Sequence, residues 1–166
     1  MNIIEATKKA VDENKAIYRK SLPHIKFVPT NSKNVAFIDV PGHEKLLKNM
    51  IAGAFGFDAS LVVIDANEGI MPQTREHLEI LNLLHVKNII VALTKKDLAT
   101  SDVIEQRTYE ITEHLKSLKN LHLVEIIPVS IYEASSIQAL KKALFNLPAT
   151  TLIQAMCTFE VNIPKS

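Results

Sequence analysis

The stretch "LVVIDANEGIMPQTREHLEILNLLHVKNIIVALTKKD" (residues 61–97) decides the fold. It holds two nearly continuous apolar runs rich in β-branched residues, 61–66 and 88–94, with a helical segment at 72–84 between them. Pro72 suits the first position of that helix, because proline has no N–H to donate there. Unbroken apolar runs are typical of strands buried on both faces of a parallel sheet. Residues 61–97 therefore predict a β-α-β unit.

The same alternation continues on both sides of this unit. Downstream, a third apolar run at 123–129 lies between helical segments at 101–119 and 135–146, which begin at Ser101 and Ser135. Upstream, the pattern predicts an amphipathic helix at 2–20, a β-hairpin formed by 25–28 and 35–39 around a turn-rich stretch, and a helix at 44–55. Strands alternating with helices predict an α/β fold, a three-layer sandwich with a mostly parallel sheet.

Composition limits the classes of function. A chain of 166 residues with net charge +1 suits one ordinary domain and gives no electrostatic reason to expect DNA. No apolar run reaches the roughly 18 residues that cross a bilayer, so we expect a cytoplasmic protein without a membrane partner. Its single cysteine, Cys157, excludes an internal disulfide. No two of the six histidines are three or four residues apart, which disfavours a metal-dependent hydrolase.

Polar residues follow the predicted strands at the edge where ligands of such sheets bind. Asp39 closes one strand, Asp65 the next, residues 94–97 ("TKKD") follow the third, and Ser130 follows the fourth. A carboxylate after a buried strand can accept hydrogen bonds from both N1–H and the exocyclic amine of guanine, while a lysine stem lies over the base. Adenine lacks that pair of donors, so "TKKD" predicts guanine recognition.

The "DVPGH" turn (39–43) has the groups that a terminal phosphate needs. Asp39 can hold Mg²⁺ through water, because that ion keeps most of its hydration shell. Gly42 lets the backbone approach a phosphate oxygen and donate its N–H. His43, the next residue, is placed to orient an attacking water.

Residues 37–81, "FIDVPGHEKLLKNMIAGAFGFDASLVVIDANEGIMPQTREHLEIL", together with "LTKKD", resemble the G domain of translational GTPases, and most of all the bacterial selenocysteine-specific elongation factors. The resemblance is specific over 35–98 and extends to 99–147 only in the order of strands and helices. It implies GTP or GDP and Mg²⁺ as cofactors and the ribosome as a partner.

The resemblance also assigns roles to single residues. It implies a magnesium-water ligand at Asp39, a γ-phosphate donor at Gly42 and a catalytic histidine at His43. The guanine-reading residues that it implies are Thr94, Lys95, Asp97, Ser130 and Ile131. Thr94 replaces the family's asparagine, and the turn at 130–132 reads "SIY" in place of S-A-x.

One part of the family pattern does not occur in these residues. The four glycines begin at Gly42 and end at Gly69, so there is no phosphate-binding loop (P-loop) of the form G-x-x-x-x-G-K-[ST]. We therefore expect residues 1–150 to form an incomplete GTP-binding domain without its first strand, with impaired nucleotide binding and hydrolysis. Domains for tRNA and for an mRNA hairpin are also expected to be absent.

The missing strand would leave a gap in the middle of the sheet, and buried unpaired backbone groups are costly. Two alternatives would close it: residues 35–39 pair directly with 60–65, or a strand at 158–163 fills the place. Residues 151–166 read as a tail in which Phe159, Val161 and Ile163 alternate as in a short strand.

Two other functions compete with the GTPase. A non-catalytic G-domain remnant acting by protein contact would keep the fold without the chemistry. A phosphoacceptor receiver-like domain also places carboxylates and a lysine at successive strand ends, but it needs a paired acidic cluster where this chain has Asp39 alone.

Overall fold

The computed structural model describes residues 24–29, 34–41, 59–147 and 152–157, and side chains are described for 59–147. Within these ranges the backbone forms a six-stranded sheet in the order β1-β2-β6-β3-β4-β5. Only β1 and β2 pair antiparallel, and every other neighbouring pair is parallel. The strands are β1 (His24–Pro29), β2 (Asn34–Pro41), β3 (Ala59–Asp65), β4 (Asn88–Thr94), β5 (His122–Pro128) and β6 (Leu152–Cys157).

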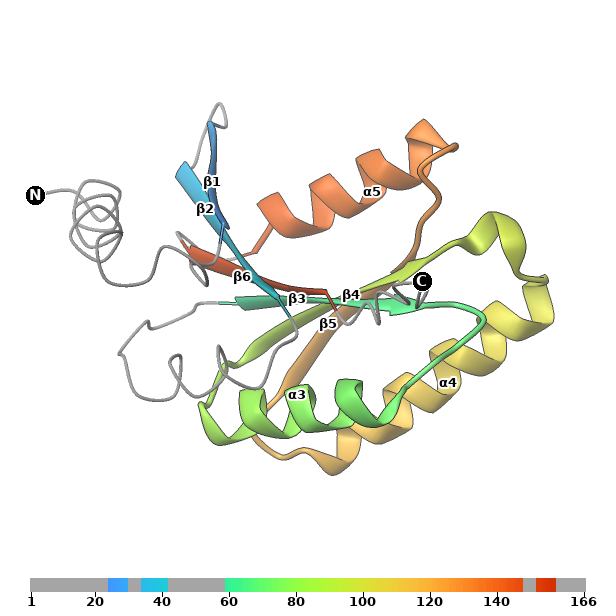
Figure 1. Ribbon diagram of the computed structural model, residues 1–166, viewed down its shortest axis with the longest axis horizontal. Helices are drawn as coiled ribbons and strands as arrows, with labels where there is room; N and C mark the ends of the chain where they lie inside the picture. The colour runs from blue at the N-terminus through green and yellow to red at the C-terminus, as the bar shows by residue number, and fades with distance from the viewer. Residues whose placement is uncertain (1–23, 30–33, 42–58, 148–151, 158–166) are drawn as a thin grey trace, which may run out of the picture.

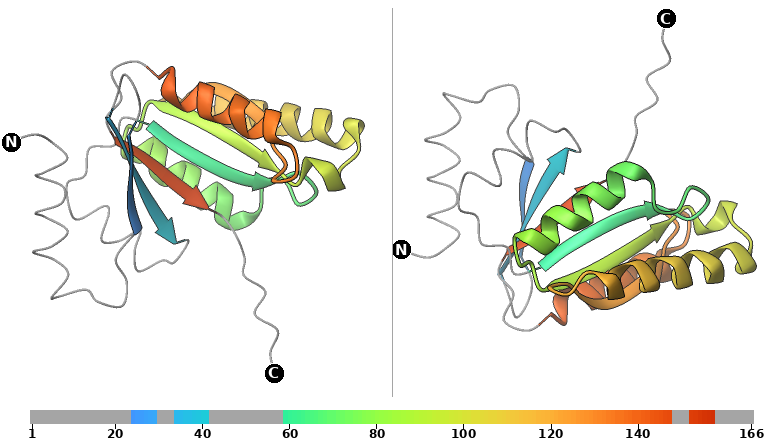
Figure 2. Two further views of the ribbon diagram at one scale, coloured as in Figure 1. Left: turned by 90° about the horizontal axis from the view of Figure 1, so that it is seen from above. Right: turned by 90° about the horizontal axis from the view of Figure 1, so that it is seen from below.

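Among the described residues, three α-helices cover the two faces of this sheet. Figure 1 shows α5 on one face and α3 and α4 on the other, and the two views of Figure 2 show the same three layers from above and below. The helices are α3 (Pro72–Leu83), α4 (Ser101–Ser117) and α5 (Ala134–Phe145), and a short 3₁₀ helix, η1 (Lys96–Leu98), follows β4. The predicted three-layer α/β sandwich with a mostly parallel sheet is confirmed.

Each face of the sheet has its own hydrophobic core. The larger core lies against α3 and α4 and includes Ile89, Val91 and Leu93 of β4, while the smaller lies against α5 and includes Ile90 and Ala92. Successive side chains of a strand point to opposite faces, so a strand covered on both sides must be apolar at every position. This explains the unbroken apolar runs in the sequence.

The gap in the middle of the sheet is filled by β6. This strand runs parallel between β2 and β3, with Ala36 opposite Leu152 and Ala59 opposite Ile153. Direct pairing of 35–39 with 60–65 is therefore wrong. A strand near the end of the chain does fill the place, but it is 152–157, and the segment predicted for this role, 158–163, lies outside the described residues.

The remaining predicted elements divide into two groups. The hairpin of β1 and β2 is confirmed, whereas the helices predicted at 2–20 and 44–55 lie outside the described residues. Helix α4 starts where predicted, but its N-cap is Thr100, whose hydroxyl accepts a hydrogen bond from the Val103 N–H at 3.4 Å. No helix in the described ranges is long and apolar enough to span a bilayer.

Candidate functional site

Three loops meet where the parallel strands β3, β4 and β5 end. Backbone hydrogen bonds join them: the Ala66 N–H donates to the Thr94 carbonyl at 3.0 Å, and the Lys96 N–H donates to the Val129 carbonyl at 3.2 Å. A further bond from the Val129 N–H to the Leu93 carbonyl, at 2.8 Å, holds the end of β5 against β4. The loops after the three strands therefore form one connected surface.

Lys95 has an unusual backbone in this surface. Its φ of 57° and ψ of 36° are left-handed, a region in which non-glycine residues are strained. Its Nζ lies 2.6 Å from Oδ2 of Asp65, which also accepts a hydrogen bond at Oδ1 from the Asn67 N–H at 2.8 Å. The Asp65 side chain is only 9% exposed, whereas that of Lys95 is 51% exposed, so a sheltered carboxylate holds the ammonium of an accessible lysine.

Each member of this ion pair favours the charged form of the other. Burial acts to raise the pKa of Asp65, but hydrogen bonds from Lys95 and from the backbone N–H groups of Asn67 and Glu68 outweigh it and lower that pKa. The hydrogen bond to Asp65 raises the pKa of Lys95. Both groups are therefore charged over the whole neutral range of pH.

Asp97 differs from Asp65 in that it is exposed and no other described residue pairs with its carboxylate. It lies in η1, which is closed by hydrogen bonds from the Leu98 N–H to the Lys95 carbonyl at 3.0 Å and from the Ala99 N–H to the Lys96 carbonyl at 3.2 Å. The backbone that carries this carboxylate is thus fixed, while the carboxylate itself is available to a ligand.

The turn after β5 is held by one buried serine. Oγ of Ser136 accepts from the Ser130 N–H at 3.0 Å and lies 2.7 Å from the Glu133 carbonyl, to which it can donate. Oγ of Ser130 accepts from the Tyr132 N–H at 3.2 Å. The N–H of Ile131, between them, has no acceptor among the described residues, and the residue as a whole is 83% exposed.

Together these groups have a defined chemical preference. A carboxylate acceptor at Asp97 and a backbone donor at Ile131 stand on loops joined by the bond between Lys96 and Val129. Such a pair complements a ring with adjacent N–H donors next to a carbonyl oxygen, which is the edge of guanine. Thr94 cannot contribute in the same way without losing a bond, because its hydroxyl already donates to the Ile64 carbonyl at 3.2 Å.

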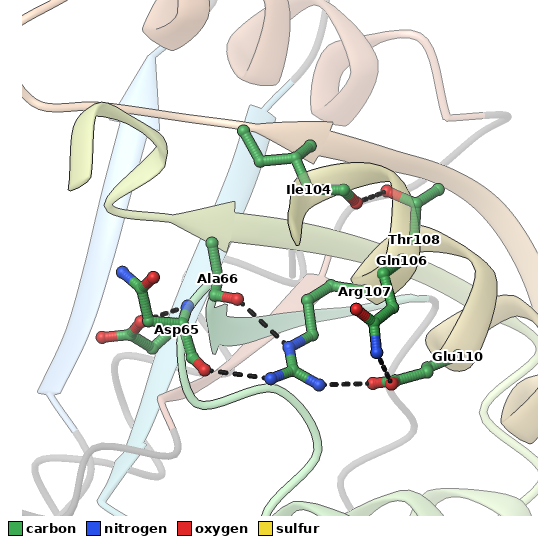
Figure 3. Close-up of polar contacts among 8 residues, drawn as sticks. Asp65, Ala66, Ile104, Gln106, Arg107, Thr108 and Glu110 are labelled. Atoms are coloured by element: carbon green, nitrogen blue, oxygen red, sulfur yellow. Dashed lines mark hydrogen bonds and ion pairs between the residues drawn. The ribbon is translucent and has the colours of Figure 1, made fainter. Parts of the chain in front are cut away.

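A clamp that the sequence did not predict braces the loop after β3 (Figure 3). Arg107 of α4 donates from Nε to the Ala66 carbonyl at 3.3 Å and from Nη2 to the Asn67 carbonyl at 3.1 Å. Its Nη1 pairs with Glu110 at 2.7 Å. Gly69, with φ of +71°, lies so close that an added Cβ would come within 2.9 Å of the Arg107 side chain. The absence of a Cβ at Gly69 therefore allows Arg107 to lie against this loop.

The described part of the chain thus brings together Thr94, Lys95, Asp97, Ser130 and Ile131 at one edge. Asp39 lies near the end of β2, parallel to β6, with Ala155 as its strand partner, so its backbone is at the same edge. Gly42 and His43 lie outside the described residues. Within the described residues no group of three or more His, Cys, Asp or Glu side chains could hold a metal ion.

Comparisons with known proteins identify a family and similar sequences. The family model described as the elongation factor Tu GTP binding domain matches residues 6–150. A selenocysteine-specific elongation factor of Desulfomicrobium baculatum is 44% identical over 121 residues, which cover 73% of this chain and 19% of that protein. A translation initiation factor 2 subunit gamma of Thermococcus onnurineus is 42% identical over 112 residues, covering 68% of this chain and 27% of that protein.

Two solved structures are similar to this chain. The elongation factor SelB of Methanococcus maripaludis, in complex with the GTP analogue GppNHp, superposes with a TM-score of 0.66 at 28% identity, covering 83% of this chain and 32% of that chain. A bacterial selenocysteine-specific elongation factor, EF-Sec, superposes with a TM-score of 0.63 at 30% identity, covering 82% and 23%. This chain therefore spans less than a third of the length of these relatives.

Proposed function

Because the chain belongs to the family of elongation factor Tu GTP-binding domains, we propose that the loops at 94–97 and 130–131 bind the guanine base of GTP or GDP. Asp97 accepts from N1–H and the exocyclic amine, Ile131 donates its backbone N–H to O6, and the stem of Lys95 covers a face of the ring. Ser130 and Thr94 shape the two turns.

One observation carries this proposal. The exposed Asp97 carboxylate and the Ile131 N–H have no partner among the described residues, although nearby polar groups such as Asp65, Ser130 and Ser136 are hydrogen-bonded. Polar groups left free on a fixed backbone need no internal bond to be broken before a ligand binds. A base with the complementary edge can therefore bind without rearranging the loops.

The phosphate end of the ligand is part of the same proposal. Asp39 would hold Mg²⁺ through water, since a carboxylate suits this hard cation. The N–H of Gly42 would donate to the γ-phosphate, and His43 would position a water for attack. Strands β6 and β3 lie between β2 and β4, so the carboxyl ends of β2 and β4 are three strand spacings, or about 14 Å, apart. A nucleoside triphosphate can bridge this distance between Asp39 and the base-binding loops.

We propose that the chain on its own binds nucleotide weakly and hydrolyses it slowly. The 166 residues contain no G-x-x-x-x-G-K-[ST] motif, and charge-assisted hydrogen bonds of the kind that such a loop supplies contribute about 1.5–3 kcal/mol each. We further propose a place in selenocysteine-specific translation elongation, supported by the selenocysteine-specific elongation factors among the relatives, with the ribosome as partner and the cytoplasm as location.

Titration with GDP, ADP and xanthosine diphosphate, followed by two-dimensional NMR up to millimolar ligand, tests base recognition. The unchanged chain is expected to bind GDP at least about tenfold more tightly than ADP. In the Asp97→Asn variant the preference should move to the xanthine nucleotide, because xanthine carries a carbonyl where guanine has its amine and the amide can donate to it. Asp102→Asn, on the neighbouring helix, is the matched control and should leave the preference unchanged.

Equal binding of GDP and ADP, or an unaltered preference after Asp97→Asn, would contradict the proposal. Absence of binding at millimolar GDP would leave a non-catalytic protein that acts by protein contact. Hydrolysis is tested separately by phosphate release. Rapid release by the unchanged chain that disappears in His43→Ala would refute the proposed impairment while supporting the role of the histidine.

A further inference from the structure

Reading guanine with Asp97 does not by itself require the ion pair between Lys95 and Asp65. We propose that Asp65 is a positioning residue for nucleotide recognition, which fixes Lys95 so that its aliphatic stem forms a preformed platform for the base. This inference rests on the proposed function and adds the residue that prepares the site.

The path of the lysine side chain supports this role. Asp65 is the strand partner of Thr94, so the ion pair links the end of β3 to the residue immediately after the end of β4. With Nζ of Lys95 held 2.6 Å from Asp65, the stem must run along the edge of the sheet instead of extending into solvent. About half of the Lys95 side chain stays exposed, so the side chain is accessible to a ligand although its ammonium is paired.

Anchoring matters because a free lysine is flexible. A surface lysine samples many rotamers, and ordering it at the moment of binding opposes association. In this chain both the backbone, in its left-handed conformation, and the ammonium are already fixed. The ordering is therefore completed during folding, and the ligand meets a rigid surface.

The carboxylate is itself held in place by its own loop. Its Oδ1 accepts from the Asn67 N–H at 2.8 Å, and the Asp65 carbonyl accepts from the Gly69 N–H, also at 2.8 Å. Arg107 fixes the carbonyls of the same loop (Figure 3). The Asn67 side chain also donates to the Leu98 carbonyl at 3.4 Å, in the turn that carries Asp97. Because Asp65 cannot follow the lysine into solvent, it serves as a fixed anchor.

The neighbouring lysine provides an internal comparison. Lys96 pairs with Glu133 at 2.7 Å, a distance nearly equal to that of the first pair, but Lys96 has no proposed role in binding the base. Glu133 is 45% exposed, so its carboxylate is far less sheltered than that of Asp65. Removing one ion pair or the other therefore separates a general effect of surface charge from a specific effect on Lys95.

The experiment compares Asp65→Asn with Glu133→Gln in the full chain, with GDP as the probe. NMR titration gives the Kd, and the methylene proton shifts of Lys95 at saturation report whether the ring lies over the stem. Asp65→Asn is expected to weaken GDP binding about tenfold and to reduce the upfield ring-current shift of these methylenes. Glu133→Gln should change neither quantity.

Unchanged GDP affinity, or an unchanged methylene shift, in Asp65→Asn would overturn the inference while leaving guanine recognition in place. If the unchanged chain does not bind GDP at all, the proposed function fails and this inference fails with it. Lys95→Met, which keeps an unbranched stem without its charge, provides a second test should Asp65→Asn not fold. It should show the same tenfold loss, and wild-type affinity in this variant would refute the anchoring role.

Discussion

Replacing Arg107 with methionine is expected to lower the free energy of unfolding by about 3 kcal/mol. The substitution removes two hydrogen bonds from a charged donor to the Ala66 and Asn67 carbonyls, each contributing about 1.5 kcal/mol. The partly exposed ion pair with Glu110 adds only about 0.3 kcal/mol. Methionine retains most of the apolar stem, so little packing is lost.

Urea denaturation followed by circular dichroism measures this change, with Glu110→Gln as the matched control. The control removes the ion pair but keeps both bonds to the loop, so it should cost less than about 0.5 kcal/mol. If both variants lose the same amount, or if Arg107→Met loses less than about 1 kcal/mol, the clamp does not brace the loop as described.

Gly69→Ala tests the same contact from the other side. The new Cβ would meet Arg107 at 2.9 Å, and alanine at a φ of +71° adds about 1 kcal/mol of backbone strain. We expect Gly69→Ala to be non-additive with Arg107→Ala, which removes the atoms that the new Cβ would meet, so that Gly69→Ala costs about 1 kcal/mol less in the Arg107→Ala background than in the unchanged chain. Simple additivity in a double-mutant cycle would refute a direct contact.

Three further changes have defined outcomes. Ser136→Ala should cost about 1–2 kcal/mol in urea denaturation, since it leaves the buried Ser130 N–H without an acceptor. Burial lowers the pKa of His77 below its ordinary 6.5, so protons bind preferentially to the unfolded chain. The free energy of unfolding should therefore fall as the pH drops through 6.5, and calorimetry should find a smaller fall in His77→Leu. The pKa of Asp65 is lowered from 3.8, so the ionised carboxylate contributes to the free energy of unfolding above that pH and this contribution is lost on further acidification. Acid unfolding of Asp65→Asn should lack this loss of stability.

The centre of the fold was predictable because its signal is local. Strand β4 is buried at its five inner positions, and a strand buried on both faces needs an unbroken run of apolar residues. The carboxyl-edge residues followed from the same reasoning, because parallel strands end at a common edge. Predicting β3, β4 and β5 therefore also predicted that residues 94–97 and 130–131 lie close together.

The parts that sequence reasoning missed depend on distant partners. Arg107 is 41 residues from the Ala66 carbonyl that it binds, and an arginine on an amphipathic helix gives no indication of such a contact. Asp65 was predicted as a residue at a strand end, but its ion pair with Lys95 was not, and the left-handed backbone of Lys95 occurs at a position where no glycine signals it. The last strand was predicted at 158–163 instead of 152–157, because apolar and polar residues alternate less clearly in "LIQAMC" than in the residues after it.

The position of β6 has a consequence for how the chain acquires its structure. Leu152 pairs beside Ala36, so the middle of the sheet joins residues from nearly opposite ends of the described chain. Contacts between such distant residues slow folding, because a long loop has to close before they form. During synthesis β2 and β3 would each keep a bare edge until residue 157 emerges, and this interval is when the nascent chain is most exposed to edge-to-edge aggregation.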